Sequence, residues 1–495
     1  MGATPMGRAR ASVASEQRLP NILVLVLDAL SAFHLSLHGY PRRTSPNIDS
    51  FAEESTVFHS HYSAGNFTTS GTASMLTGLL PWSHRAINHG GLVRETYVRN
   101  SPFALLASDF FRLSFTQNTW AHRLILQDAE MVDRLLQPAS YSLLTDGHPL
   151  EERRADSLMR SFALDEFLFP MQGELPAASS MLGYLRRSRT LRRQLPTSSP
   201  RYPKGAPEAI NPGAWIPYLN EQVFDGVVAE VQATSMLDRP FLAYIHLWSP
   251  HFPYRPRSDY RSLFRDEFVP TPKRAPYLPG ALSEDWLLNQ RTLYDRQIRQ
   301  LDDEFGEMMA HLRSAGLLRN TYVILTSDHG ELFERGFYGH GLRRLYEPVV
   351  RIPLIIHEPG QRARREVWSP TSNVDLFPTL LSLVGVMAPP KLDGSILPPF
   401  GGDETWDRPV FSADAATNSA ASDIKHAALC MRQGALKLIA YLGLPGLDEA
   451  YELYDVEEDP GEENDLAQAN PALVERLRGQ LLDHLSQANR VARSS

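Results

Sequence analysis

The amino-acid sequence predicts an α/β fold in which a large, mostly parallel central sheet is flanked by helices. A smaller C-terminal α+β subdomain with a short antiparallel sheet follows. Two apolar runs of buried-strand type, residues 21–28 and 321–329, each end in polar residues. Strand and helix patterns alternate over residues 322–384, as a parallel βα sheet requires. Proline pairs at 389–390 and 398–399 mark a boundary, and short strand patterns follow it.

Each element of the large domain has a local reason in the sequence. Residues 22–27 are uninterruptedly apolar, and a Ser-Pro pair is expected to open a helix over about 47–54. Thr68 is expected to open the next helix. Apolar residues recur near helical spacing over 286–315, so that helix is expected to pack against the core. The other expected elements are strands at 241–247, 322–326 and 352–356 and a helix at 374–384.

The C-terminal subdomain is expected to form a small antiparallel sheet closed by one helix. The expected elements are strands at 409–413, 427–432, 436–441 and 452–454 and a helix at 471–487.

The length of the chain predicts more than one domain. A single core usually stops growing at about 250–300 residues, and this chain has 495. Residues 1–18 form a polar N-terminal segment that we expect to be disordered. The large domain is expected over 19–390, with a variable insertion at about 100–235, and the C-terminal subdomain over 391–495.

Composition excludes some classes of partner and of site. With 49 Lys and Arg against 57 Asp and Glu, the net charge is −8, which gives no reason to expect nucleic acid as a partner. Cys430 is the single cysteine, so no internal disulfide can form. No apolar run reaches the ~18 residues of a membrane helix, and the start of the chain lacks the apolar middle of a signal peptide. A cytoplasmic protein is therefore expected, or an exported one if the N-terminus is incomplete.

Residues 66–78 contain a cluster of hydroxyl side chains, with Thr68 as a candidate nucleophile. A hydroxyl is a poor nucleophile near neutral pH unless a base or a metal ion lowers its pKa. Asp28 ends the first apolar run, and Asp328 and His329 end the second. Because ligands collect at the carboxyl ends of strands in open α/β sheets, these groups could converge on one cation.

Further motifs follow in a consistent order along the chain. They are Ser45-Pro-Asn-Ile-Asp49, Ser249-Pro-His-Phe-Pro253, Gly339-His-Gly341, Arg351-Ile-Pro-Leu-Ile355 and Asn373-Val-Asp-Leu-Phe-Pro-Thr379. Together with the strand ends and the hydroxyl cluster they resemble the sulfatase branch of the alkaline phosphatase superfamily, from about residue 20 to 467. The resemblance implies an alkaline phosphatase-like fold and an enzyme acting on an anionic ester of a small molecule, a glycan or a lipid head group.

The resemblance also implies a metal site. One divalent ion, Mn²⁺, Mg²⁺, Ca²⁺ or Zn²⁺, would be held by Asp28, Thr68, Asp328 and His329. Two carboxylates and one imidazole suit such an ion.

Roles in catalysis and substrate binding follow from the same resemblance. Thr68 is the expected nucleophile, with Thr69 and Ser70 as alternatives. His251 and His340 match the family's substrate-holding and proton-donating positions, and from the sequence their roles are interchangeable. Asn66 and Arg344 are candidate substrate-binding residues, although Asn66 is equally typical of a loop or cap and Arg344 of a solvated charge.

The sequence departs from formylglycine sulfatases at the nucleophile. Those enzymes convert a Cys or Ser, followed by a Pro and an Arg, to formylglycine. Here the position falls on Thr68, with Ser70 and Thr72 in place of the Pro and Arg. Threonine cannot yield that aldehyde, so no formylglycine is expected. Ala29 also stands where the family has a second Asp.

A threonine nucleophile resembles instead the phosphoethanolamine transferases and lipoteichoic acid synthase. We therefore expect a hydrolase or transferase that acts on a phosphate, phosphonate or phosphodiester through a covalent threonyl intermediate. Two alternatives are a sulfuric ester hydrolase without formylglycine and an inactive relative that binds an anionic glycan or lipid head group.

Two remaining features of the sequence are expected to have no catalytic role. The arginine-rich segment 185–193 is typical of a solvated helix face or an insertion, with an anion-binding surface as the alternative. Six histidines outside the family motifs are interpreted mainly as surface or loop residues: His34, His38, His59, His61, His84 and His89.

Overall fold

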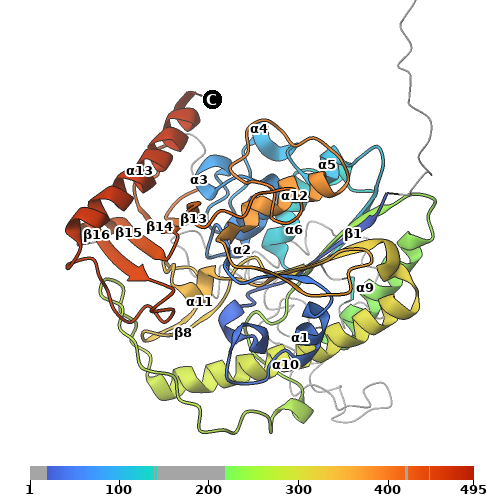
Figure 1. The fold of residues 1–495 in the computed structure, drawn as a ribbon, viewed down its shortest axis with the longest axis horizontal. Coiled ribbons are helices and arrows are strands. Elements are labelled where there is room, and N and C mark those ends of the chain that lie inside the picture. Colours follow the sequence, from blue (N-terminus) through green and yellow to red (C-terminus); the bar gives the residue numbers. More distant parts are fainter. Residues whose placement is uncertain (1–18, 139, 142–217, 419–421, 445, 495) are drawn as a thin grey trace, which may run out of the picture.

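A computed structural model describes residues 19–138, 140–141, 218–418, 422–444 and 446–494. Figure 1 shows a central sheet with helices on both faces and a smaller sheet at one side, next to the long helix α13 (Pro471–Ser494). This arrangement confirms the predicted fold class. The arginine-rich segment 185–193 lies outside the described residues.

The central sheet has eight strands. Their spatial order is β11 (Arg365–Val367), β2 (Thr56–Phe58), β10 (Leu354–His357), β7 (Thr321–Thr326), β1 (Asn21–Leu27), β6 (Phe241–Leu247), β4 (Phe111–Thr116) and β5 (Arg134–Leu136). The smaller pairs are β3 (His61–Tyr62) with β12 (Thr371–Ser372) and β8 (Leu332–Glu334) with β9 (Phe337–Gly339). The described α-helices before α13 are α1 (Pro46–Ala52), α2 (Thr68–Thr77), α3 (Pro81–His84), α4 (Glu95–Val98), α5 (Pro102–Leu105), α6 (Thr119–Leu126), α9 (Asn220–Ser235), α10 (Glu284–Ser314), α11 (Glu347–Val350) and α12 (Leu376–Leu383).

One strand departs from the predicted parallel alternation. β1 pairs in parallel with both β6 and β7, and β4 pairs in parallel with β6. β10, however, runs antiparallel to both β7 and β2. A parallel neighbour requires a long crossover, usually through a helix. The chain between β7 and β10 instead contains the hairpin of β8 and β9 and the four-residue helix α11, and it returns in the opposite direction.

Burial on both faces explains why β1 reads as a continuous apolar run. On one face, Leu23, Leu25 and Leu27 belong to a cluster that includes residues of α9 and α10. On the other face, Val24 and Val26 pack in a second cluster with residues of α2, α5 and α12. The central strand therefore has no solvated side, and its carboxyl end is held rigidly.

Helix α2 is built to approach the sheet closely. It follows Phe67, whose backbone is extended, and it ends at Gly78, which adopts the left-handed conformation with φ of 67°. All ten of its residues are buried. A Cβ on Gly71 would lie 2.1 Å from the backbone oxygen of Asp328, so only glycine allows this approach. The small residues of this segment thus bring the start of the helix to the end of β7.

A buried network of ion pairs links the small sheet to α11, in the connection between two strands of the large sheet. Its strands are β13 (Val410–Ala415), β14 (Ala427–Gln433), β15 (Leu436–Leu444) and β16 (Leu447–Asp455), all antiparallel. The buried amine of Lys437 on β15 lies 2.9 Å from Glu347 Oε1 and 2.7 Å from Glu462 Oε1. Glu347 belongs to α11, so the pairs connect the small sheet to the connection between β7 and β10.

Replacing Lys437 with methionine is expected to destabilise the fold by about 3–5 kcal/mol, because it leaves two buried carboxylates without their cation. The decrease would be measured as a lower urea midpoint of unfolding. Lys425→Met, at an exposed position, is the matched control and should leave the midpoint unchanged. Equal midpoints for the two variants would contradict the stabilising role of the pairs.

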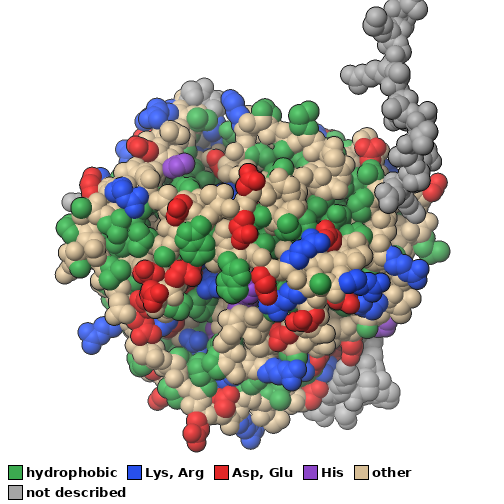
Figure 2. Space-filling view, viewed as in Figure 1, with side chains coloured by type: hydrophobic (Ala, Val, Ile, Leu, Met, Phe, Trp, Pro, Cys, Tyr) green, Lys and Arg blue, Asp and Glu red, His purple; other side chains and the backbone are tan. Residues whose placement is uncertain are grey.

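On the face in Figure 2, Lys and Arg side chains are interspersed with Asp and Glu. None of the described helices combines the length and apolarity needed to cross a bilayer.

Candidate active site

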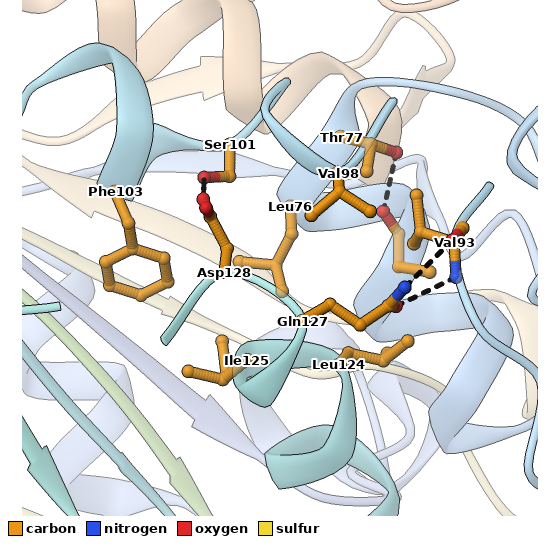
Figure 3. Close-up of a pocket in the computed structure, with 11 residues that line it drawn as sticks. Leu76, Thr77, Val93, Val98, Ser101, Phe103, Leu124, Ile125, Gln127 and Asp128 are labelled. Carbon is orange, nitrogen blue, oxygen red and sulfur yellow. Dashed lines mark hydrogen bonds between the residues drawn. The ribbon is translucent and has the colours of Figure 1, made fainter. Parts of the chain in front are cut away.

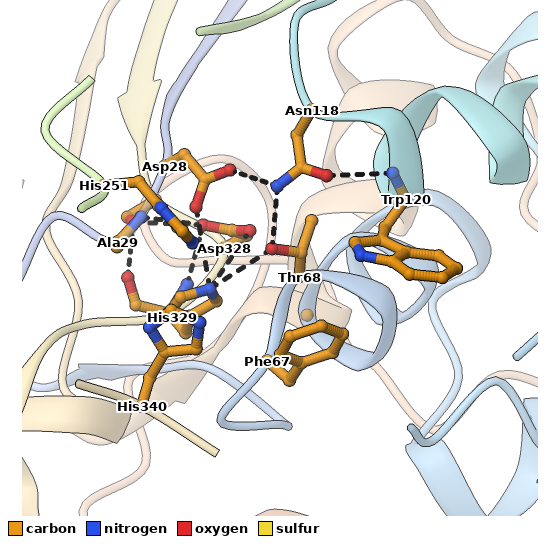
Figure 4. Close-up of polar contacts among 12 residues, drawn as sticks. Asp28, Ala29, Phe67, Thr68, Asn118, Trp120, His251, Asp328, His329 and His340 are labelled. Atoms are coloured by element: carbon orange, nitrogen blue, oxygen red, sulfur yellow. Dashed lines mark hydrogen bonds and ion pairs between the residues drawn. The ribbon is translucent and has the colours of Figure 1, made fainter. Parts of the chain in front are cut away.

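Four neighbouring strands deliver polar residues to one edge of the sheet. Asp28 follows β1, Asp328 and His329 follow β7, His246 lies near the end of β6, and Asn118 follows β4. All five side chains are buried. Figure 4 shows most of this group around Thr68. The parallel strands therefore bring together residues that are up to 301 positions apart in the chain.

Asp28, Asp328 and His329 form a cluster suited to one cation. One ligand atom from each lies within 4.8 Å of the other two. His329 Nδ1 lies 2.9 Å from the backbone oxygen of Gly330, so Nδ1 carries the proton and the Nε2 lone pair faces the carboxylates. Asp28 Oδ1 and Asp328 Oδ2 are buried without a hydrogen-bond partner among the described residues. Such orphaned oxygens beside an imidazole nitrogen fit a divalent ion.

The charges within this cluster shift its pKa values in opposite directions. Burial alone would raise the pKa of Asp28, but His251, His246 and His329 hold it below its ordinary value. Burial alone would lower the pKa of His329, but Asp328 and Asp28 raise it. The Asp28 carboxylate thus remains anionic and retains a charge that a cation needs.

Thr68 lies at the first turn of α2, beside this cluster. Its Oγ1 is 3.4 Å from His329 Nε2 and accepts a hydrogen bond from Asn118 Nδ2 at 3.1 Å. The unpaired N–H groups and the dipole at the start of a helix favour negative charge. The position therefore suits a hydroxyl that attacks an anionic ester.

The two alternative nucleophiles are oriented differently. Ser70 Oγ donates a hydrogen bond to the backbone oxygen of Phe67 at 3.0 Å, which engages it within its own turn. Thr69 Oγ1 is buried and has no hydrogen-bond partner among the described residues. Thr68 is the member of the three whose hydroxyl contacts His329.

His251 and His340 lie next to His329. The ring centroids of His340 and His329 are 4.2 Å apart, and those of His251 and His340 are 4.9 Å apart. His251 Nδ1 lies 2.8 Å from the backbone oxygen of Phe252, and His340 Nδ1 lies 2.8 Å from Glu331 Oε1. In each ring the partner of Nδ1 is an oxygen acceptor, so Nε2 remains available for a substrate.

Glu331 contacts both His340 and Tyr254. Its Oε2 accepts a hydrogen bond of 2.6 Å from the hydroxyl of Tyr254. Burial raises the pKa of Glu331 to about 7. Burial and the neighbouring His329 and His251 hold the pKa of His340 well below its ordinary value. Glu331 therefore orients an imidazole that is neutral in this arrangement.

Asn66 and Arg344, the other predicted substrate-binding residues, contact each other through the loop after β9. Asn66 Nδ2 donates to the backbone oxygen of Arg344 at 3.0 Å and to Asp414 Oδ2 at 3.1 Å. The guanidinium of Arg344 donates to the backbone oxygen of Leu278 at 2.9 Å and lies over the ring of Phe337. These contacts hold the loop of His340 in place, and a direct contact with substrate stays a prediction.

Sequence reasoning missed two residues of the site, Asn118 and His246. Asn118 Nδ2 donates to Asp28 Oδ2 at 2.6 Å as well as to Thr68, while its Oδ1 accepts from Trp120 N and caps α6. His246 Nε2 lies 3.4 Å from Asp28 Oδ2 and 3.6 Å from Asp328 Oδ2. Two signals were available in the sequence. One is the alternating pattern of β4, followed by Gln-Asn, and the other is a lone histidine within the apolar run of β6.

The interpretation of the other histidines as mainly surface or loop residues was wrong for His34, His61 and His84, which lie in helical turns or strands. His34, His59, His61 and His84 are buried. His34 Nδ1 contacts Asp295 Oδ1 at 2.6 Å, and His84 Nε2 contacts Ser74 Oγ at 3.0 Å. Such partners satisfy an imidazole inside the core, and they cannot be read from single-sequence patterns.

Ala29, which replaces the family's second Asp, has an unusual backbone. Its φ is 62°, in the left-handed region that a residue with a Cβ rarely adopts. Its N–H donates to Asp328 Oδ1 at 3.2 Å, and its carbonyl accepts from the hydroxyl of Tyr294 at 2.6 Å. These bonds hold the strained turn, which places Asp28 opposite Asp328.

A separate cavity behind α2 is too small to bind a substrate. Figure 3 shows it between α2, α5 and α6, lined mainly by apolar side chains. Ser101 Oγ donates to Asp128 Oδ2 at 2.6 Å at one side. The volume of about 20 Å³ has room for about one water molecule.

Comparisons with known proteins agree with this architecture. The family model described as Sulfatase matches residues 20–106 and 192–386, and the model described as N-sulphoglucosamine sulphohydrolase, C-terminal, matches residues 334–490. The solved structure of the phosphonate monoester hydrolase of Agrobacterium radiobacter superimposes with a TM-score of 0.66 at 19% identity. It covers 95% of this chain and 96% of that chain. At that identity the likeness shows the fold alone.

Among curated proteins, arylsulfatase K of Canis lupus familiaris is 30% identical over 204 residues, which are 40% of this chain and 37% of that protein. The chain therefore matches less than two fifths of that relative's length. N-acetylgalactosamine-6-sulfatase of the same species is 25% identical over 413 residues, 79% of this chain and 68% of that protein. Because the Sulfatase model covers more than half of the chain, with the strand ends and the start of α2 inside the matched region, this protein belongs to the sulfatase family.

Proposed function

We propose that this protein is a metal-dependent hydrolase that cleaves a phosphate, phosphonate or phosphodiester bond through a covalent intermediate on Thr68. The observation that carries the proposal is the position of Thr68 Oγ1. It lies at the start of a buried helix, 3.4 Å from His329 Nε2 and beside the carboxylates of Asp28 and Asp328. Threonine at this position cannot become formylglycine, which favours direct attack by the hydroxyl.

Asp28, Asp328, His329 and Thr68 would hold the ion. When bound, a divalent ion would lower the pKa of the Thr68 hydroxyl and polarise a non-bridging oxygen of the substrate. Asn118 holds Thr68 Oγ1 in position through the hydrogen bond of its Nδ2. The helix start and the imidazoles of His251 and His340 bind the anionic head group.

The reaction consists of two displacements. Thr68, after losing its proton to solvent, forms a bond from Oγ1 to phosphorus while the bond from phosphorus to the leaving oxygen breaks. The leaving oxygen takes a proton from Nε2 of His251, which enters this step in its protonated form, because His340 is neutral in this arrangement. Water then attacks phosphorus and gives a proton to the same histidine, while the bond to Thr68 Oγ1 breaks and Oγ1 regains a proton from solvent. The products are the free acid and an enzyme in its starting state.

Sulfate ester hydrolysis through the same threonine is the second candidate. It is favoured by the match of the chain to relatives named as sulfatases. The two candidates use the same residues and differ in the central atom of the ester.

A panel of chromogenic esters distinguishes the candidates. We expect turnover of p-nitrophenyl phosphate, p-nitrophenyl phenylphosphonate or bis-p-nitrophenyl phosphate with Mn²⁺, Mg²⁺, Ca²⁺ or Zn²⁺. Turnover confined to p-nitrophenyl sulfate would support the second candidate, and no turnover on the panel would favour an inactive binder. Mass spectrometry of the peptide 60–85 after substrate trapping should find the adduct on Thr68. An adduct on Thr69 or Ser70 would contradict the assignment of the nucleophile.

Replacing Asn118 with aspartate is expected to lower kcat/KM by about 10²–10³-fold. The change puts an acceptor where a donor now bridges Asp28 Oδ2 and Thr68 Oγ1, and loss of one donor at a reacting oxygen has an effect of this size. Aspartate also caps helices well, so α6 should be preserved. The thermal midpoint is expected to fall, because the new carboxylate is buried against Asp28 Oδ2. Wild-type kcat/KM in this variant would show that the bridge is dispensable.

A further inference from the structure

His246 lies beside the carboxylates of Asp28 and Asp328 and has no role in the mechanism described above. It belongs to β6, where it pairs with Val26 of β1 on one side and with Thr116 of β4 on the other. Its side chain is fully buried. A residue in the middle of a sheet is held more firmly than one on a loop, so the imidazole has a fixed position relative to the strand ends.

The Nε2 atom of His246 is aimed at the two carboxylates and makes no hydrogen bond among the described residues. It lies 3.4 Å from Asp28 Oδ2 and 3.6 Å from Asp328 Oδ2. His329 Nε2 is likewise 3.6 Å from Asp328 Oδ2. Neighbouring ligands around an ion with bonds of ~2.1 Å are separated by roughly 3.0–3.5 Å. The distances from His246 Nε2 to the two carboxylate oxygens are close to this range. The ligand atoms that all lie within 4.8 Å of one another belong to Asp28, Asp328 and His329, so the imidazole of His246 approaches this group from the Oδ2 side of Asp28.

The other ring nitrogen has a partner of its own. Nδ1 of His246 lies 3.4 Å from the hydroxyl of Tyr244, which is buried on the same face of β6. With Nδ1 placed beside this hydroxyl, Nε2 is the ring nitrogen directed at the carboxylate oxygens of Asp28 and Asp328, the side on which a cation would lie.

We propose that His246 is an additional protein ligand of the metal ion, so that the site holds its ion with two imidazoles, two carboxylates and the Thr68 oxygen. This inference rests on the proposed function only in requiring that the site binds an ion. A second imidazole shifts the preference of the site away from Ca²⁺ and Mg²⁺, which take oxygen ligands, and toward Zn²⁺ or Mn²⁺. His246 thus selects the class of metal.

Metal binding to the full chain tests the proposal without an activity assay. Metal-free protein would be titrated with Zn²⁺ and with Mn²⁺ by calorimetry. His246→Gln is expected to raise the metal Kd by at least about 10–100-fold. His84→Gln is the matched control because His84 is equally buried but is engaged by Ser74 Oγ. An unchanged Kd in His246→Gln, or an equal rise in both variants, would overturn the proposal.

X-ray absorption of the wild-type protein loaded with Zn²⁺ keeps the test independent of whether the variants fold. Scattering from two imidazoles per ion is the expected result. One imidazole per ion would show that His246 only hydrogen-bonds to the carboxylates from outside the ligand set, and it would overturn the proposal while leaving the proposed function intact. Failure of the wild-type protein to bind any divalent ion would overturn both.

Discussion

Replacing Thr68 with alanine is expected to lower turnover by at least about 10³-fold and to abolish the covalent adduct on the 60–85 peptide. This is the largest effect expected for a single side chain, because removing a nucleophile eliminates the two-step route and leaves only the contribution of substrate binding. The measurement is kcat/KM on the ester that the wild-type protein cleaves best. The folded state should be nearly unchanged, since Thr68 loses one hydroxyl and a helix start tolerates alanine.

The adjacent threonine supplies the matched control. Thr69 is equally buried, belongs to the same turn of α2, and its hydroxyl has no hydrogen-bond partner among the described residues. Thr69→Ala should therefore keep kcat/KM within a few-fold of the wild type. Thr68→Ser, which restores a hydroxyl, should recover part of the activity. If Thr68→Ala cleaves the substrate at the wild-type rate, the proposed mechanism is wrong.

Removal of the metal ion is the second change with a large expected effect. Dialysis against a chelator should abolish turnover, and Zn²⁺ or Mn²⁺ should restore it. The same ions should raise the thermal midpoint, because an ion at 100 times its Kd stabilises the folded state by about 2.7 kcal/mol. The physical cause is the pair of buried carboxylates, Asp28 and Asp328, whose mutual repulsion an ion relieves.

Substitution of one ligand should remove both responses. Asp328→Asn keeps the shape of the side chain but halves the carboxylate charge of the site, and we expect neither reactivation nor a rise in the thermal midpoint when the ion is added. Asp303→Asn, on α10 and outside the site, should respond as the wild type does. A chelator-treated protein with full activity would contradict metal dependence.

The sequence anticipated the features of the fold that depend on local patterns. The strand β1 was predicted because burial on both faces requires a continuous apolar run. The long helix α10 was predicted because its apolar residues recur at helical spacing. The start of α2 at Thr68 was predicted from the hydroxyl cluster and the family motif. The structure confirms these elements within a few residues of the predicted bounds.

The direction of β10 could not be predicted from such patterns. Its apolar residues fit a parallel or an antiparallel neighbour equally well, because both faces of the sheet are covered by helices. The direction depends on the path of the chain between β7 and β10, where a hairpin and a short helix replace the crossover helix.

The sequence alone determined the sulfatase resemblance. It also predicted Asp28, Asp328 and His329 as candidate ligands of one ion and Thr68 beside them, because each of these residues ends or begins an element in a recognisable motif. Only the tertiary structure brought in Asn118 and His246. His246 is a single polar residue in the apolar strand β6, and Asn118 follows β4. Their roles depend on strand register, which aligns His246 with Val26 of a strand more than 200 residues earlier. Register between distant strands is decided by the packing of the whole sheet, and no short stretch of sequence contains it.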